Sequence, residues 1–212
     1  MTILALEFSS PQRSVALAHD GRVLATASET GERTTHAFAM IEKVLADAGL
    51  QRGQIEALVV GLGPGSYTGI RVALAIAQGW QLATGVKLLG ISSADAIAAQ
   101  ALAEKCSGRA SVVIDAQRGE FYRAAYEIGS DGGRETTALQ IVTLEKLQAV
   151  AAAGEILIGP EVTRWFPDGQ TIFPTAAALA GLAAGRTDFT PGEKLEPIYL
   201  RETTFVKLAA QR

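Results

Sequence analysis

The amino-acid sequence predicts an α/β protein of two lobes, in which the second lobe is a shortened copy of the first. Short apolar runs of strand length alternate with longer segments whose apolar residues recur at helical spacing. One order of elements, strands followed by a helix, begins near residue 3 and begins again near residue 111. In both places an apolar strand ends in an acidic residue, Glu7 or Asp115. This repeated order favours two similar lobes, each with a mixed sheet flanked by helices.

The first lobe is expected to open with three antiparallel strands. Residues 3–8 form an apolar run, and residues 14–18 and 22–29 follow it as further strands. Asp20 and Gly21 lie between the last two strands, and this dipeptide favours a tight hairpin turn. The three strands are therefore expected to form a meander.

A helix is predicted over residues 37–48, because apolar residues there fall on one helical face. Thr34 or Thr35 is expected to cap its start, and Gly49 is expected to end it. The rest of the first lobe is expected to hold a buried strand over residues 55–62 and a long helix over residues 69–83. A further strand over residues 87–90 and a helix over residues 92–105, capped by one of the two serines at its start, are expected to follow.

The second lobe is predicted to repeat this order in a shorter form. Its strands are expected over residues 111–115, 120–128, 139–142 and 156–158, and a turn over residues 129–133 follows the second of them. One expected helix runs from Thr143 to Gly154, and another covers residues 175–184. The boundary is placed near residue 108, so that residues 1–107 form the first lobe and residues 108–212 form the second lobe and its tail.

Composition excludes several classes of protein. Of the 212 residues, 48% are hydrophobic and 19% are charged, which favours a packed globular core over disorder. A single cysteine, Cys106, excludes an intramolecular disulfide, and residues 1–8 lack the basic segment of a secretory signal. Charged and polar residues interrupt the apolar stretch 70–91, so no membrane span is expected. We therefore expect a cytoplasmic protein.

A glycine-rich segment, GLGPGSYTGIR over residues 61–71, carries the strongest local signal. Its glycines permit close approach of the backbone, and Ser66 or Thr68 can cap the helix that follows. The spacing matches neither the P-loop nor the dinucleotide-binding fingerprint, so a structural turn and a ligand-contacting loop both remain as interpretations. The candidate contacts for an anion or a nucleotide phosphate are Ser9, Ser10, Gly63, Gly65 and Ser66.

No catalytic constellation, metal site or cofactor is predicted. The two histidines, His19 and His36, lie seventeen positions apart, and neither has a histidine partner. His19 is expected beside a hairpin turn and His36 at the start of the first helix, both outside the core. Cys106 has no nearby group that would activate its thiol, and nothing indicates a serine-protease triad.

Several segments together resemble the TsaB family. The glycine-rich segment is similar to that family's GPGSFTGxR signature, and four further segments match the family pattern in order. They are ILALEFSS from residue 3, ISSADAIA from residue 91, VVIDAQRGEFY from residue 112 and EPIYLR from residue 196. These segments span almost the whole chain. The resemblance implies an actin-like (ASKHA) fold of two ribonuclease-H-like lobes.

The resemblance also implies a role. TsaB-like proteins pair with a catalytic paralogue, TsaD, and with a small ATPase, TsaE, and the assembly transfers threonylcarbamoyl to N6 of the tRNA adenosine beside the anticodon. The chain is therefore expected to be a non-catalytic scaffold or activator, with a homodimer as a further expectation for the chain alone. Its net charge of −3 shows no electrostatic footprint for nucleic acid, so tRNA is expected to be met only indirectly.

Two departures from the family pattern bear on nucleotide hydrolysis. Glu7 stands where the TsaB pattern usually has Asp, and Arg13 stands where it usually has a small residue. In actin-like ATPases, acids at the two strand ends that correspond to Glu7 and Asp115 hold a metal–nucleotide between the lobes. An ATPase acting between these two acids is therefore a rival interpretation. The preferred interpretation is that both acids cap turns.

The long helix over residues 69–83 is apolar on nearly every side, which is typical of a buried helix. Its own sheet covers one side, and the resemblance places the TsaD-like partner on this helix and on the first helix. The expected interface residues are His36, Met40, Ile41, Ile70, Ala73, Leu74, Ala77 and Trp80. Ala73→Arg or Ala77→Arg is accordingly expected to weaken pairing. The alternatives are that the two lobes bury this helix themselves, or that the chain self-associates through it.

Overall fold

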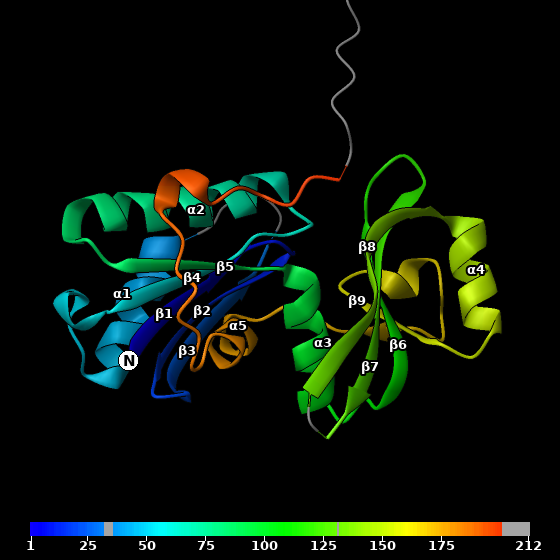
Figure 1. Ribbon diagram of the computed structural model, residues 1–212, viewed down its shortest axis with the longest axis horizontal. Coiled ribbons are helices and arrows are strands. Elements are labelled where there is room, and N and C mark those ends of the chain that lie inside the picture. Colours follow the sequence, from blue (N-terminus) through cyan, green and yellow to red (C-terminus); the bar gives the residue numbers. More distant parts are fainter. Residues whose placement is uncertain (32–35, 131, 201–212) are drawn as a thin grey trace, which may run out of the picture.

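The structure, a computed structural model, describes residues 1–31, 36–130 and 132–200. Within these residues two sheets of five strands form the frame of the molecule (Figure 1). The first sheet contains β1 (Thr2–Glu7), β2 (Gln12–His19), β3 (Arg22–Thr30), β4 (Ala57–Gly61) and β5 (Lys87–Ile91). The second sheet contains β6 (Gly108–Asp115), β7 (Glu120–Gly129), β8 (Gly132–Thr143), β9 (Ile156–Gly159) and β10 (Gln170–Thr171). The helices are α1 (Ala37–Ala48), α2 (Tyr67–Thr84), α3 (Ser93–Ala103), α4 (Leu144–Ala152) and α5 (Ala176–Leu182).

The strands of both sheets follow the same order along the chain. The first sheet runs β3-β2-β1-β4-β5, with β1 to β3 antiparallel and β4 and β5 parallel to β1. The second sheet runs β10-β9-β6-β7-β8, in which β6 takes the place of β1 and β9 takes the place of β4. Asp20 and Gly21 have φ values of 47° and 78°, as the predicted hairpin turn requires. The predicted duplication of an α/β lobe, in the actin-like arrangement, is therefore confirmed.

The second lobe is the shorter copy. Its strands β9 and β10 have 4 and 2 residues, and a short 3-10 helix, Val162–Arg164, stands where the first lobe has the long helix α2. One strand prediction was too short, because β8 covers Gly132–Thr143 rather than residues 139–142. Most of this strand is exposed at the edge of the sheet and pairs with β7 through its backbone, so it shows little apolar alternation.

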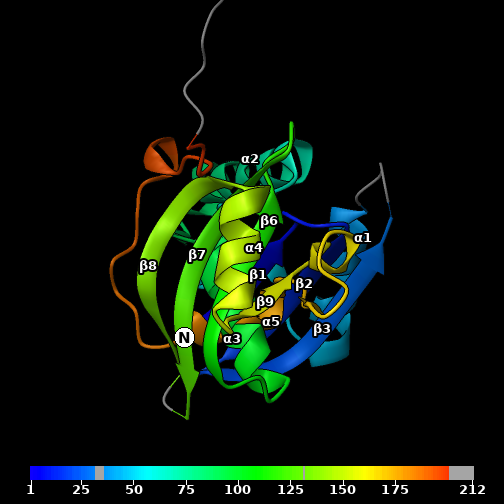
Figure 2. The ribbon, with the colours of Figure 1, turned by 90° about the vertical axis from the view of Figure 1, so that its right-hand side faces the viewer.

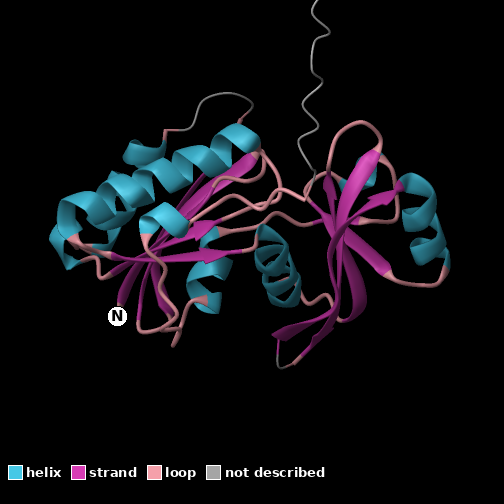
Figure 3. Ribbon diagram, turned by 45° about the horizontal axis from the view of Figure 1, so that its top comes forward, coloured by secondary structure: helices cyan, strands magenta, loops and turns pink. Residues whose placement is uncertain are grey.

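Helices cover both faces of the first sheet and connect it to the second (Figure 3). α1 and α2 pack on one face, where Leu6 and Val60 meet Ile41 and Ile70. α5 packs on the other face through Leu179, although it comes from the second half of the chain. α3, from the first half, packs mainly on the second sheet and against α5. This exchange of helices was not predicted, and it makes each sheet's core depend on both halves of the chain.

α4 completes the layers by covering the remaining face of the second sheet (Figure 2). The helix ends follow the expected local signals in part. α3 begins after Ser92, one of the two predicted serine caps, and α1 ends at Gly49 in the left-handed conformation. His36 is the residue before the first turn of α1, and the predicted caps Thr34 and Thr35 lie outside the described residues. In the described part of the chain, none of the helices has the length and hydrophobicity that a membrane span needs.

Candidate functional site

The glycine-rich segment packs the start of α2 tightly against the end of β1. Ser66 caps α2, since its Oγ accepts a hydrogen bond from Gly69 N at 3.3 Å, and its own N–H donates to Ser9 O at 2.7 Å. A Cβ at Gly65 would lie 2.1 Å from Ser9 O, and one at Gly69 would lie 1.9 Å from Phe8 O. Any larger residue at either position would collide with this backbone. The segment therefore forms a tight turn, and its interpretation as a ligand-contacting loop stays a prediction.

Glu7 lies behind this segment, and its side chain is 0% exposed. Its Oε1 accepts a hydrogen bond from Ser9 N at 2.8 Å, and its Oε2 accepts one from Ser93 Oγ at 2.9 Å. The same Ser93 Oγ accepts a hydrogen bond from Gly63 N at 3.1 Å. A Cβ at Gly61 would lie 2.0 Å from Oε2, so this glycine leaves room for the carboxylate. Burial raises the pKa of Glu7, and the hydrogen bonds from Ser9 and Ser93 oppose that rise.

Glu7→Gln is expected to flatten the pH dependence of stability. The ordinary pKa of a Glu side chain is 4.5, and the pKa of Glu7 in the folded state lies above it. As the pH rises from 4.5 through this higher pKa, the unfolded state loses its proton first, so the free energy of unfolding falls. Over that window the free energy of unfolding should fall in the wild type and stay level in Glu7→Gln, which keeps an acceptor for Ser9 N. Urea denaturation at a series of pH values measures both proteins.

Glu7→Ala is the matched comparison, because it leaves the amide of Ser9 without its acceptor. This variant should lose about 1–3 kcal/mol at every pH. Identical pH profiles for the wild type and Glu7→Gln would contradict a buried carboxyl with a raised pKa.

A cleft of about 1520 Å³ opens between the two lobes. Its walls come from the β1–β2 turn and the start of α2 on one side, and from the β6–β7 turn on the other. Four of the five predicted anion contacts line this cleft: Ser9, Ser10, Gly65 and Ser66. Gly63 does not, because it is buried and its N–H is bonded to Ser93 Oγ, so it offers no amide to an anion. The expectation for Gly63 is corrected accordingly.

Asp115 lies in the wall of the cleft and caps its own turn. Its Oδ1 accepts a hydrogen bond from Gln117 N at 2.7 Å, and its Oδ2 accepts one from Gln117 Nε2 at 3.2 Å. Glu7 serves the β1–β2 turn in the same way, through Ser9 N. Both acids therefore cap turns, as the preferred interpretation predicts. Glu7 does not line the cleft, so an ATPase acting between these two acids lacks one of its two carboxylates there.

The two histidines lie at separate places near the surface. His19 Nε2 lies 3.1 Å from Asp20 Oδ2, and His36 Nδ1 lies 3.0 Å from Glu29 Oε2. Among the described residues, no group of three or more His, Cys, Asp or Glu side chains could hold a metal ion. Burial raises the pKa of the Cys106 thiol, so this side chain is a poor nucleophile.

Six of the eight predicted interface residues are buried within the first lobe itself. The six, each at most 6% exposed, are Met40, Ile41, Ile70, Ala73, Leu74 and Ala77. They face the first sheet and its core, because they recur on the inner sides of α1 and α2. The expectation that these six meet a partner is therefore corrected. His36 is exposed and Trp80 is partly exposed, so these two remain at the surface.

The side of α2 that faces away from the sheet is nevertheless apolar. Its apolar residues that are exposed or partly exposed, termed the outer α2 face, are Val72, Ala75, Ile76, Gly79, Trp80, Leu82 and Ala83, and the exposed Thr68 and Arg71 precede them in the first turns of the helix. None of the residues of the outer α2 face carries a charge, and Leu82 is 90% exposed. Gln78 and Gln81 are turned aside and hydrogen-bond to the backbone of Gly192. Val72, Ile76 and Trp80 pack partly against the core of the first lobe, whereas Ala75, Gly79, Leu82 and Ala83 are exposed among the described residues. The described parts of the two lobes therefore bury this face only in part.

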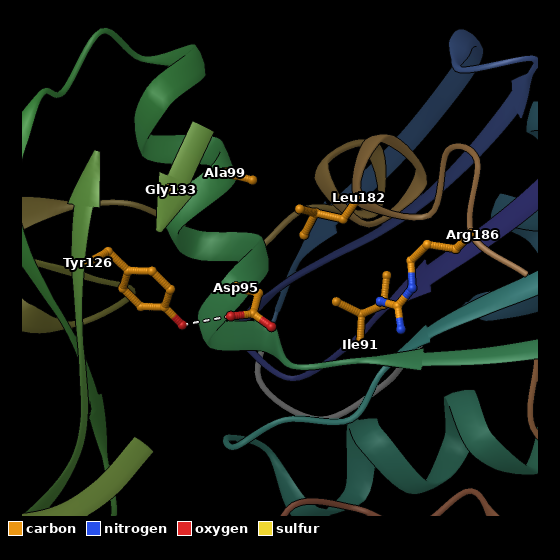
Figure 4. A pocket seen from close by; sticks show the side chains of 7 residues that line it. All are labelled: Ile91, Asp95, Ala99, Tyr126, Gly133, Leu182 and Arg186. Atoms are coloured by element: carbon orange, nitrogen blue, oxygen red, sulfur yellow. Dashed lines mark hydrogen bonds between the residues drawn. The ribbon is translucent and has the colours of Figure 1, made fainter. Parts of the chain in front are cut away.

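A smaller pocket of about 120 Å³ lies between α3, α5 and the second sheet (Figure 4). The Tyr126 hydroxyl from β7 donates to Asp95 Oδ1 on α3 at 2.8 Å. Burial raises the pKa of Tyr126, which keeps this donor protonated. The Arg186 guanidinium at the pocket is already hydrogen-bonded to Asp188 Oδ1, at 2.9 Å. These contacts connect α3 to the second sheet.

Comparison with known proteins decides the family. A family model for TsaD, described as tRNA N6-adenosine threonylcarbamoyltransferase, matches residues 32–188. The TsaB protein of Escherichia coli (strain K12), named for tRNA threonylcarbamoyladenosine biosynthesis, is 31% identical over 223 residues, which cover 95% of this chain and 95% of that protein. The chain belongs to the TsaB family. The TsaB protein of Bacillus subtilis (strain 168) is 29% identical over 129 residues, which cover 60% of this chain and 56% of that protein.

Solved structures agree with this assignment to the TsaB family. YeaZ from Pseudomonas aeruginosa superposes with a TM-score of 0.81 at 28% identity, covering 94% of this chain and 99% of that chain. A second structure from the same organism, described as similar to the peptidase YeaZ, has a TM-score of 0.81 at 29% identity, with the same coverage. Both structures therefore share the complete two-lobed fold with this chain.

Sequence reasoning missed two features of the site. Ser93 was considered only as a helix cap, whereas its hydroxyl connects Glu7 to the glycine-rich segment. The available signal was the pair of adjacent serines in ISSADAIA, since one of them suffices as a cap. Phe38 on α1, which is 65% exposed, was not singled out either. An aromatic residue at a position off the apolar face of α1 was the signal for it.

Proposed function

We propose that the chain is a non-catalytic subunit required for transfer of threonylcarbamoyl to N6 of the tRNA adenosine beside the anticodon. Several of its relatives are named for tRNA threonylcarbamoyladenosine biosynthesis. In this proposal the chain docks on a TsaD-like catalytic paralogue and keeps that enzyme in a working arrangement, together with a TsaE-like ATPase, in the cytoplasm. It uses no cofactor of its own, and the chain alone forms a homodimer through the same surface.

The outer α2 face is the observation that carries this proposal. A contiguous apolar surface of this kind on a soluble domain marks a site of protein–protein contact. A specific contact buries about 1,600 Å² in total, which is more than one helix side provides. α1 packs on the same face of the sheet as α2, and its outer side presents Phe38 and His36. The outer side of α1 therefore extends the docking surface.

Gly79 gives geometric support to docking on this face. A Cβ at Gly79 would meet nothing within 4 Å, so no contact in the described chain requires glycine there. Glycine inside a helix destabilises it by roughly 0.5–1 kcal/mol relative to alanine. Ala75 and Ala83 lie one turn away on either side, and together the three small residues leave space for another helix to approach closely.

Support for a non-catalytic role comes from the residues that an enzyme would need. A histidine-based metal site needs two or more histidines that come together, whereas the range that matches the TsaD model contains a single histidine, His36. Glu7 is buried and bonded to Ser9 and Ser93, so it is not available to hold a metal–nucleotide in the cleft.

An omission experiment tests the proposed function. Threonylcarbamoyladenosine is measured by mass spectrometry of nucleosides after incubating tRNA and threonylcarbamoyl-adenylate with the TsaD-like paralogue and the TsaE-like ATPase. Product should form when this chain is added and should be absent when it is left out. Product formed by this chain alone would contradict the non-catalytic role. An unchanged yield without the chain would contradict the requirement for it.

A further inference from the structure

Segments that lie far apart in the sequence meet at the mouth of the cleft. The start of α2 contributes Tyr67 and Arg71, the β6–β7 turn contributes Arg118, and the last described segment contributes Tyr199. Tyr199 is held beside α2 because the N–H of Ile198 donates to a carbonyl of the glycine-rich segment at 2.9 Å. The docking surface on α1 and α2 uses none of these side chains, so the cleft mouth is a separate feature.

Tyr67, Tyr199 and Arg71 form a cluster of two rings and a guanidinium. The ring centroids of Tyr67 and Tyr199 lie 5.8 Å apart, with 30° between the ring planes. The guanidinium carbon of Arg71 lies 3.6 Å from the Tyr67 centroid and 5.9 Å from the Tyr199 centroid. Tyr67 nevertheless stays 56% exposed and Tyr199 stays 44% exposed. Exposed rings and guanidinium planes are the groups on which unpaired nucleobases stack.

Charge at the cleft mouth favours an anionic ligand. Arg118 is exposed, has a φ of 61°, and forms no ion pair with any residue in the described part of the chain. The two acids of the cleft already have partners. Asp115 accepts two hydrogen bonds from Gln117, and Glu161 pairs with Arg164 at 3.2 Å. A phosphate group in the cleft would therefore meet an available cation.

We propose that the cleft mouth binds single-stranded RNA directly, with a base stacked on Tyr67 or Tyr199 and a phosphate held by Arg118. The cleft of about 1520 Å³ exceeds the roughly 300–1,000 Å³ of ordinary small-molecule sites, which suits a segment of a polymer. This inference rests on the proposed function, because a subunit of a tRNA-modifying assembly meets RNA as its substrate. It departs from the expectation, based on net charge alone, that tRNA is met only indirectly.

Fluorescence anisotropy with a labelled, short, single-stranded oligoribonucleotide tests this proposal on the full chain. The wild type should bind, and its affinity should fall with salt with a log–log slope of about 0.7 for each phosphate contacted. Tyr199→Leu should weaken binding about 5- to 100-fold through loss of one stacked base. Arg118→Gln should weaken binding and reduce the salt slope by about 0.7. Arg109→Gln, at an arginine that is 73% exposed on β6 and does not line the cleft, is the matched control and should bind as the wild type does.

Absence of binding by the wild type would overturn the proposal, as would wild-type affinity in both cleft variants. Competition by free adenosine monophosphate as effective as that by unlabelled oligoribonucleotide would also overturn it, because the site would then take a single nucleotide. Light scattering with the TsaD-like paralogue tests the proposed function independently of RNA binding. Both cleft variants should still pair with the paralogue. A chain that pairs but binds no RNA contradicts this inference alone, and a chain that binds RNA but does not pair contradicts the proposed function alone.

Discussion

Ala73→Arg should unfold the first lobe. Ala73 is 0% exposed and belongs to the core between α2 and the first sheet. A guanidinium at this position would be buried without an ionic partner, which costs several kcal/mol. That cost is a large share of the roughly 5–15 kcal/mol by which a typical domain is stable. Circular dichroism and urea denaturation should therefore show loss of the cooperative unfolding transition.

Ala75→Arg is the matched control for this prediction, since Ala75 is exposed on the same helix. Its stability should stay within about 0.5 kcal/mol of the wild type. The sequence led to the expectation that Ala73→Arg or Ala77→Arg weakens pairing, whereas the burial of both residues predicts a loss of folding instead. If Ala73→Arg were as stable as the wild type, the placement of α2 against its sheet would be wrong.

Gly79→Arg should abolish pairing with the TsaD-like paralogue while the chain remains folded. An arginine side chain at this position extends into open space in the free chain. In the proposed complex the same side chain would be buried without a partner, at a cost of several kcal/mol, which corresponds to a loss of affinity of at least about 100-fold. Isothermal titration calorimetry with the paralogue measures this loss.

Ala149→Arg provides the control for pairing, because Ala149 is an exposed helical residue on α4 in the second lobe. This variant should pair with the wild-type dissociation constant. Pairing of Gly79→Arg with unchanged affinity would rule out the outer α2 face as the docking surface.

The order of the elements was predictable because local patterns carry it. The apolar run of β4 is buried along its whole length, and Ser66 caps α2. The sheet on which α3 and α5 pack was not predictable, since both helices are rich in alanine and show small residues on several sides. Small side chains fit either sheet, so the path of the chain decides where these helices lie.

The inner and outer sides of α2 could not be told apart from the sequence for a related reason. Ile70, Ala73 and Ala77 recur at helical spacing on the inner side, but Ala75 and Gly79 recur in the same way on the outer side. The spacing of the apolar residues therefore indicated two apolar sides of α2 without showing which side packs on the chain's own sheet.

The candidate site was predictable only where its residues are neighbours in sequence. Ser9, Ser10, Gly65 and Ser66 belong to recognisable turns and line the cleft. The contact of Ser93 with Glu7 joins residues 86 positions apart, and only the fold brings them together. The same holds for the rings of Tyr67 and Tyr199 at the cleft mouth, which are 132 positions apart in the sequence.

The central claim is that this chain acts by docking on a TsaD-like partner. Light scattering after size exclusion, on the chain alone and mixed with that paralogue, tests the claim most directly. The mixture should elute as a discrete complex whose mass equals the sum of the two chains, and any homodimer of the free chain should disappear as the partner is added. A mixture that still elutes as two separate species, with and without nucleotide and the TsaE-like ATPase, would contradict the claim.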